Sequence, residues 1–302
     1  MVVCETSVVA RTTVPIPTRL LVLGLAHEDG SIRADEVYEV GESCGQSAEQ
    51  LRSCLRRLVA EELFTRQGAG RTAVYVPTEA GQVTLERGMQ RVRLSYAQDR
   101  AGRGWDRRWH LAGFAVPESR RAARDGFRDV LLGMGGAPVQ GGLYVSPHAW
   151  DDDVRREAKR LGMVEHLTLA STAELEVGGV RDPRELAAAL WPLDDVARRY
   201  ARFVEAHLEV PERLEQHKRK HGRLADADFL PLALTMAVAY TECSARDPYL
   251  PPELLPRPWP GRQARDIVVR SRRLALQLRA TAGRPSLFGM FDDMLESLAG
   301  PA

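Results

Sequence analysis

Apolar residues recur with helical spacing in two neighbouring segments near the N-terminus. Residues 18–29 are rich in leucine, and Gly30 follows them directly. Residues 31–45 mix apolar and acidic positions, and Gly45 can adopt the left-handed backbone that ends a helix. We therefore expect two consecutive helices here, the first of them mostly buried.

A third segment, which starts at Ser47, has the clearest amphipathic pattern. Ser47 and Gln50 have the spacing of a capping box, in which each side chain bonds the backbone of the other residue. One face of the predicted helix carries Ala48, Leu51, Cys54, Leu55, Leu58 and Val59. The other face carries Gln50, Ser53, Arg56 and Arg57. We expect the first face to be buried and the second to be exposed.

Two short strand-like runs follow, at 63–66 and 72–76, with a glycine-rich turn at 68–71 between them. This pattern predicts a β-hairpin. Thr78 then begins another amphipathic helix, whose apolar positions are Val83, Leu85, Met89, Val92 and Leu94. Helix, helix, basic helix, hairpin and helix is the element order of a winged helix-turn-helix domain.

Positive charge is concentrated around the third helix and the hairpin. Only three of the 42 basic residues are lysine, and an excess of arginine spread over every segment is typical of a GC-rich genome. The distribution is more informative. Residues 1–46 hold three arginines and seven acidic residues, whereas residues 47–108 hold twelve arginines and seven acidic residues. The change from −4 to +5 is a local excess of positive charge that any functional interpretation has to explain.

The composition is that of a globular protein of two or three domains. The 302 residues are 44% hydrophobic and 27% charged, and no run approaches the ~18 apolar residues of a membrane helix. The N-terminus lacks the basic and apolar pattern of an export signal, so we expect a cytoplasmic protein. The cysteines, at 4, 44, 54 and 243, lack the paired spacing of a zinc site and are expected to be free thiols.

Beyond the glycines at 102–104, strand-like and helical runs alternate. The runs predict strands at 109–116, 141–146 and 166–170 and helices at 119–134 and 151–161. This β-α-β-β-α-β rhythm is typical of a ferredoxin-like domain. Residues 133–136 are superficially similar to a phosphate-binding loop, but no Gly-Lys-Ser/Thr follows them, so ATP binding is not expected.

From residue 182 onward the pattern is helical. Helices are predicted at 184–190, 194–208, 228–245 and 263–279, with a proline-rich link at 248–260. His217 and His221 are four residues apart, as in some metal sites, but the three cationic residues between them would repel a metal ion. We therefore expect a solvated basic turn at this position.

The predicted fold class is α+β, with three domains. They are a winged helix-turn-helix DNA-binding domain at 18–100, a ferredoxin-like middle domain at 105–178 and a helical C-terminal domain at 182–280, with a leader at 1–17 and a tail at 281–302. This order places DNA recognition in the first domain.

Four stretches of the chain resemble the PaaX family of transcriptional regulators. They are the winged helix, Trp-Asp-Arg-Arg-Trp-His at 105–110, Val-Pro-Glu-Ser-Arg at 116–120, and the proline-rich string at 247–256 with Trp-Pro-Gly at 259–261. The resemblance covers residues 18–275, and the proline-rich string is its most specific part. It implies a repressor that binds double-stranded operator DNA as a homodimer and responds to phenylacetyl-coenzyme A or a similar aryl thioester.

One position departs from the family. The family's middle domain is similar to a small CRISPR-associated nuclease, and the family usually has an acidic residue before the hydrophobic-Pro-Glu step. Ala115 stands there in this chain. Because a metal-dependent nuclease needs carboxylates to hold its cation, we expect no enzyme, no metal and no cofactor, and a middle domain that serves as a sensor or a dimerisation module.

The expected DNA contacts come from the third helix and the hairpin. They are Gln46, Ser47, Gln50, Ser53, Arg56, Arg57, Arg66, Arg71 and Thr72. Arginine can fork onto guanine and glutamine onto adenine in the major groove. The alternative is that these residues form an ordinary solvated face.

The expected effector contacts cluster at the entry to the middle domain. They are Arg107, Arg108, Trp109, His110 and Tyr144, an aromatic and cationic set that suits an acyl-coenzyme A. The alternative is that the tryptophans fill the core and the arginines cover the domain joint. For the whole chain two other functions stay open: a metal-dependent nuclease-like enzyme on the middle domain, and a regulator without small-molecule control.

Overall fold

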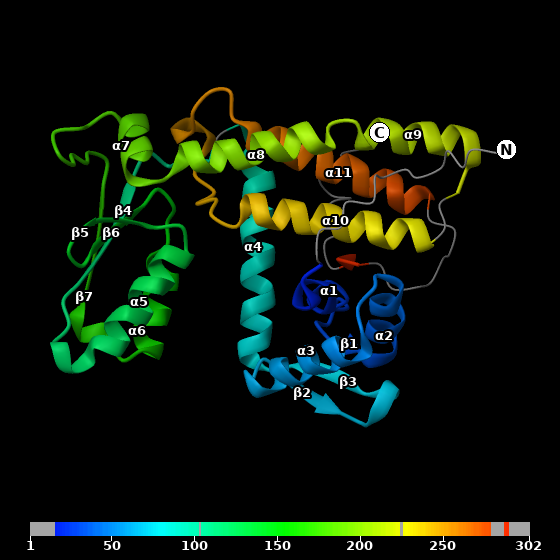
Figure 1. Cartoon of the computed structure of the whole chain (residues 1–302). Coiled ribbons are helices and arrows are strands. Elements are labelled where there is room, and N and C mark those ends of the chain that lie inside the picture. The colour runs from blue at the N-terminus through cyan, green and yellow to red at the C-terminus, as the bar shows by residue number, and fades with distance from the viewer. Residues whose placement is uncertain (1–15, 103, 224–225, 279–286, 290–302) are drawn as a thin grey trace. The chain divides into compact units, whose positions relative to one another are not determined.

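The computed structural model describes residues 16–102, 104–223, 226–278 and 287–289, except for the side chains of 87–89, 91 and 226–231. The leader to residue 15, Cys4 and most of the predicted tail lie outside the described residues. Two compact units divide the chain (Figure 1). Unit one draws on Met1–Arg93, Ala201–Cys243 and Gly261–Ala302, and unit two on Leu94–Tyr200 and Ser244–Pro260.

The N-terminal part of unit one packs helices beside a small antiparallel sheet. Its elements are α1 (Thr18–Gly24), β1 (Ile32–Arg33), α2 (Ala34–Ser43), α3 (Ala48–Ala60), β2 (Phe64–Gln67), β3 (Val74–Pro77) and α4 (Glu79–Ala101), with strand order β1-β3-β2. Leu21, Val37, Leu51, Leu55 and Leu58 are buried between the first three helices. The predicted burial of the apolar face of α3 is confirmed at these leucines.

The α2–α3 contact is unusually close. A Cβ atom placed on Gly41 of α2 would lie 2.6 Å from Leu51 Cδ1 of α3. Real Cβ atoms do not approach a carbon this closely, so Gly41 leaves the space that Leu51 fills. The separation between these two helices therefore depends on a missing side chain.

Two helix boundaries in this part were predicted wrongly. The first helix ends at Gly24 rather than at residue 29. The second begins at Ala34 rather than at residue 31, because Ile32 and Arg33 form β1 and pair with Tyr75 and Val74. A strand of two residues is too short to show an alternating pattern, and only its partner β3 reveals it.

Three apolar positions predicted to be buried are exposed. Val59 at the end of α3 and Val83 and Leu94 of α4 each show more than a third of their surface to solvent. Helix α4 has 23 residues, a length of ~35 Å, so the small N-terminal core cannot cover all of it. Its buried residues near the end are Ser95, Tyr96 and Gln98. The side chain of Met89 lies outside the described residues.

Unit two contains the β-α-β-β-α-β unit that the sequence predicts. Its elements are β4 (Trp109–Phe114), α5 (Arg121–Gly133), β5 (Ala137–Gln140), β6 (Leu143–Ser146), α6 (Asp151–Arg160) and β7 (Leu167–Thr172), with antiparallel strand order β5-β6-β4-β7. Strand β5 was not among the predicted runs. It contains Pro138, which an edge strand tolerates because its outer N–H needs no partner.

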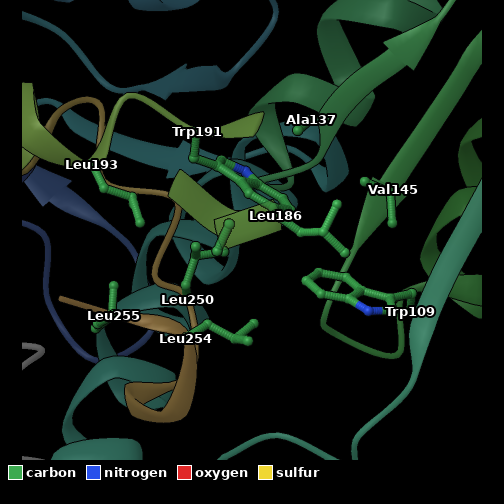
Figure 2. Close-up of a cluster of buried hydrophobic side chains, with 10 residues drawn as sticks. Trp109, Ala137, Val145, Leu186, Trp191, Leu193, Leu250, Leu254 and Leu255 are labelled. Carbon is green, nitrogen blue, oxygen red and sulfur yellow. The ribbon is translucent and has the colours of Figure 1, made fainter. Parts of the chain in front are cut away.

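The two faces of this sheet bury different side chains. Helices α5 and α6 lie along one face of the sheet (Figure 1). The buried residues on this face include Ala112, Phe114 and Tyr144. The other face carries Trp109 and Val145 beneath α7 (Pro183–Leu190) and the short helix η4 (Pro252–Leu254). Figure 2 shows the buried side chains that meet in this second core, most of them labelled. Both faces are therefore hydrophobic, as in a sheet between two layers.

Residues 247–259, which we call the strap, hold the entry to this sheet. The buried carboxylate of Asp247 accepts hydrogen bonds from Tyr200 Oη (2.6 Å) and from its near neighbour Tyr249 N (2.7 Å). The Glu253 carboxylate accepts from the backbone N–H groups of Gly104 (3.1 Å) and Trp105 (3.5 Å). The proline-rich string that carries the resemblance is thus a structural clamp on the segment before β4.

The remaining helices follow the predicted pattern with one addition. They are α8 (Leu193–His207), α9 (Val210–His221), α10 (Asp226–Ser244) and α11 (Pro260–Leu278). Helix α9 was not predicted as a helix, and its last turn contains the residues expected to form a basic turn. Of its apolar positions, Val210 and Leu214 are buried, which anchors the first half of the helix.

We predict that Glu253→Gln loosens the entry to the middle domain. A charged acceptor bonds more strongly to N–H groups than an amide does, so the free energy of unfolding should fall by about 1 kcal/mol. Urea unfolding followed by tryptophan fluorescence measures this change. The control is Glu165→Gln, an exposed glutamate of unit two with no hydrogen bond to any described residue. Equal stability of the two variants would contradict the clamp.

We also predict that Cys44, just after α2, reacts slowly. Burial raises the pKa of the Cys44 thiol from 9.0 to about 11. At pH 8 its thiolate fraction should then be about 100-fold lower than that of an unperturbed thiol. Because the thiolate is the reactive form, alkylation of Cys44 should be slower by a similar factor. Iodoacetamide labelling with peptide mapping measures the rate, and the urea-unfolded chain supplies the reference. A folded rate equal to the unfolded one would be the contrary result.

Candidate nucleic-acid interface

The start of α3 is fixed by the capping box that the sequence predicts. Ser47 Oγ accepts from Gln50 N at 3.2 Å, and Gln50 Oε1 accepts from Ser47 N at 2.7 Å. Two backbone N–H groups at the helix end are thereby satisfied. The free N–H groups and the positive end of the helix dipole remain at an exposed position, which suits an anion.

Glu49, Ser53 and Arg56 form the outward stripe of α3, opposite its buried leucines. The Glu49 carboxylate contacts Arg52 Nη1 at 2.5 Å and Arg56 Nη2 at 3.3 Å. All three charged side chains are more than half exposed. The stripe thus presents a carboxylate between two guanidinium groups rather than positive charge alone.

Glu49 is the residue that the sequence reasoning missed. Its spacing of three and seven residues to Arg52 and Arg56 puts all three on neighbouring turns, and this spacing could have revealed the pairs. Glutamate can accept a hydrogen bond from the cytosine amino group, so Glu49 belongs to the candidate set.

Arg57 and Arg66 are the least engaged of the predicted DNA contacts. Both are exposed, and neither forms an ion pair with a residue that the structure describes. Burial raises the pKa of the Cys54 thiol, and the nearby Arg57 guanidinium opposes that shift. Burial likewise raises the pKa of Tyr75, which pairs across the hairpin with Arg66, and the Arg66 charge opposes it. These two arginines are available to an external anion.

The hairpin tip is tied to α2. Gly68 and Gly70 have φ angles of +79° and +63°, a backbone that favours glycine, and they turn the chain between β2 and β3. Arg71, beyond the turn, bonds Glu42 Oε1 at 2.9 Å and lies over the Tyr38 ring at 5.4 Å. Thr72, also exposed, donates through Oγ1 to the Ala69 carbonyl at 3.1 Å. Arg71 is therefore already paired with a carboxylate of its own domain.

The two predicted glutamine contacts are engaged within the chain. Gln46 Oε1 accepts from Thr18 Oγ1 at 2.6 Å, and its Nε2 donates to the Ile16 carbonyl at 3.1 Å. Gln50 uses its Oε1 in the cap of α3. A bidentate contact with adenine requires both amide atoms, so neither side chain is free to make one in this arrangement.

The five predicted effector contacts do not form one site. Trp109 is buried beside Trp105 and Trp191, with ring centroids 5.2 and 6.3 Å away. Tyr144 is buried on the opposite face of the sheet. It pairs with Ala112, which lies an odd number of residues from Trp109 on β4, and side chains an odd number of residues apart on a strand point to opposite faces. Its ring stacks on Phe114 at 5.7 Å. The aromatic residues therefore serve as core, which is the alternative that the sequence left open.

The cationic members of that set are placed differently. Arg107 is exposed, whereas Arg108 donates to Ser171 Oγ at 2.9 and 3.2 Å and to its carbonyl at 3.1 Å. The buried His110 ring lies between Asp151 Oδ2 at 2.9 Å and Asp106 Oδ2 at 3.1 Å. A histidine that bonds two carboxylates is a structural bridge, because no ring nitrogen remains to activate a nucleophile.

No helix in the described part of the chain is both long enough and apolar enough to cross a membrane. No group of three histidine, cysteine, aspartate or glutamate side chains among the described residues is arranged to hold a metal ion.

Two domain profiles of one protein family match this chain. The sequence profile of the PaaX protein central Cas2-like domain matches residues 102–187, and that of the PaaX-like protein C-terminal domain matches residues 191–284. Among solved structures, the uncharacterized protein Rv0674 from Mycobacterium tuberculosis is similar at 20% sequence identity and a TM-score of 0.48, over 87% of this chain and 97% of that chain.

No curated protein matches the chain. PaaX proteins are transcriptional regulators, generally without enzyme activity. The two profiles adjoin one another and together span more than half of the 302 residues, in the order expected of such a regulator. This chain therefore belongs to the PaaX-like family.

Proposed function

We propose that this chain is a sequence-specific DNA-binding transcriptional regulator, a cytoplasmic repressor of the PaaX type. The observation that carries the proposal is the capped helix α3, which buries its leucines, exposes Glu49 and Arg56 on the opposite side and leaves Ser53 between them half-buried. An exposed polar stripe that starts at a helix N-terminus is the form in which proteins read base edges. Family membership supports the same conclusion.

The N-terminal part acts as a winged helix-turn-helix domain. Helices α2 and α3 are the two helices of the motif, with Cys44–Gln46 as the turn between them, and the β2–β3 hairpin is the wing. Strand β1, which precedes α2 in the chain, attaches the wing to the helices because it pairs with β3 of the hairpin. In this arrangement α3 enters the major groove and the wing meets the backbone beside it.

Different exposed side chains contact the bases and the phosphates. Arg56 forks onto guanine O6 and N7, and Glu49 either holds Arg56 in that orientation or accepts from a cytosine amino group. Arg57 and Arg66 bind phosphates and set the register of the helix on the duplex. Ser47 and Ser53 are small enough to let α3 approach the bases.

The regulator acts as a homodimer on a pseudo-palindromic operator. A two-fold axis would place the two α3 helices one DNA turn, ~34 Å, apart. The helical C-terminal region supplies part of the dimer contact. Release by an acyl- or aryl-coenzyme A remains part of the proposal, with Arg107 and Arg108 as the predicted residues that stay near the surface for its phosphates.

The first test concerns base recognition. Arg56→Ala should weaken operator binding by about 1–3 kcal/mol, because a bidentate guanine contact is lost, and should relax selectivity at one base pair. Fluorescence anisotropy with operator and scrambled duplexes measures both effects. Arg155→Ala, on helix α6 and paired with Asp152, is the matched control. Equal losses on operator and scrambled DNA would make Arg56 a phosphate contact instead.

The second test concerns the phosphate contacts. The double variant Arg57→Gln, Arg66→Gln should reduce the slope of log K against log salt by about 2, since each phosphate contact contributes about 0.9. The preference for operator over scrambled DNA should stay within about twofold, because phosphate contacts carry no sequence information. The control is Arg155→Gln, Arg156→Gln, which removes the same charge from α6. An unchanged slope would contradict these assignments.

A further inference from the structure

The basic turn, which we define as residues 217–223, concentrates charge at the end of α9. Its sequence is His-Lys-Arg-Lys-His-Gly-Arg, and it contains two of the three lysines of the whole chain. No acidic residue interrupts it. With the two histidines neutral the segment carries a charge of +4, from two lysines and two arginines.

Local hydrogen bonds hold the backbone of this turn in place. Gly222 has a φ of +73°, and its N–H donates to the Lys218 carbonyl at 3.1 Å, which closes the helix. His217 Nε2 donates to the Arg223 carbonyl at 2.9 Å, which fastens the residue beyond the helix back onto it. The charges are therefore carried by a built turn rather than by a loose loop.

Three of these cations have no anionic partner among the residues that the structure describes. Arg219, Lys220 and Arg223 are exposed, and none forms an ion pair with a described residue. Lys218 bonds a neutral amide, Gln277 Oε1, at 2.9 Å. Elsewhere arginines are commonly held by a carboxylate. Examples at 2.5–3.0 Å are Arg155 with Asp152, Arg156 with Asp153, Arg181 with Glu176 and Arg213 with Glu209.

The helix dipole explains only part of this charge. Cations in the last turn of a helix are stabilised by the partial negative charge there. That effect accounts for Lys218 and its neighbours within the helix, but not for Arg223, which lies beyond the helix end. A surface that leaves several fixed cations unneutralised is complementary to an extended polyanion.

We propose that the basic turn is a second, sequence-independent contact for the phosphates of duplex DNA. The proposal rests on the proposed function, because operator binding is what brings a duplex to this chain. We assign to it DNA that flanks the operator core, because the proposed function already assigns the core to α3 and the hairpin. The described side chains of the turn include no apolar residue that could insert into a lipid bilayer, which disfavours a membrane as the partner.

The test uses the full-length protein and a charge-matched pair of variants. The first variant is Arg219→Gln, Lys220→Gln, Arg223→Gln, which spares His217 and Lys218. The control is Arg155→Gln, Arg156→Gln, Arg181→Gln, three exposed arginines of unit two that have carboxylate partners. Each variant lowers the net charge by three. Binding is measured by anisotropy on an operator duplex of about 20 base pairs and on one of about 60, roughly two and six helical turns.

On the long duplex, the first variant should bind about tenfold more weakly near physiological salt and lose about 2 from the slope of log K against log salt. On the short duplex it should match the wild type, and the control should match the wild type on both. Restoring charge with Lys at positions 219 and 223 should recover most of the loss, which separates charge from folding. Equal behaviour of the first variant and the control would overturn the proposal.

Two further outcomes separate the proposed function, the phosphate contact and a membrane contact. If the wild-type protein binds operator and scrambled DNA equally, the proposed function is wrong. A reduced slope of log K against log salt in the first variant would still support the phosphate contact of the basic turn. If the first variant loses binding to vesicles containing anionic phosphatidylserine but keeps its binding to the long duplex, the partner is a membrane and the proposal is wrong.

Discussion

The burial of one face of α3 is the constraint on which the N-terminal part, and with it the proposed DNA contact, depends. Leu51, Leu55 and Leu58 are almost fully buried, and Leu51 occupies the space that the missing side chain of Gly41 leaves on α2. Only one rotation of the helix about its axis buries these leucines together, and that rotation turns Glu49 and Arg56 outward. The cap at Ser47 fixes where the outward stripe begins. The side chains proposed to recognise DNA are thus positioned by packing on the opposite side of the same helix.

Charge pairing separates the basic residues into two groups. Arg56 and Arg71 each bond a carboxylate of their own domain, so a phosphate that binds them must replace an existing anion. Arg57, Arg66 and the cations of the basic turn form no ion pair with a described residue, so a phosphate that bound them would displace no carboxylate. The paired arginines therefore suit contacts that discriminate between sequences, and the unpaired ones suit contacts that supply affinity.

In the middle domain, residues adjacent in sequence lie on opposite faces of the sheet, because side chains alternate between the two faces along a strand. Trp109 enters the core beneath α7, while His110 turns to the other face and bridges two aspartates. Glu253 of the strap then holds the segment just before this strand. The aromatic and cationic residues that are adjacent in sequence are therefore divided among a core, a bridge and a surface. This division explains why they do not assemble into one ligand pocket.

The sequence by itself determined the elements whose signals are local. The cap of α3, its leucine face, the hairpin and, apart from β5, the order of strands and helices in the middle domain depend on residues within a few positions of each other. Only the tertiary structure decided the rest. It revealed β1 through its partner β3, left Val83 without a covering neighbour, and joined Arg71 to Glu42 across 29 residues. The physical reason is that burial and ion pairing are set by neighbours in space, whereas periodicity and capping are set by neighbours along the chain.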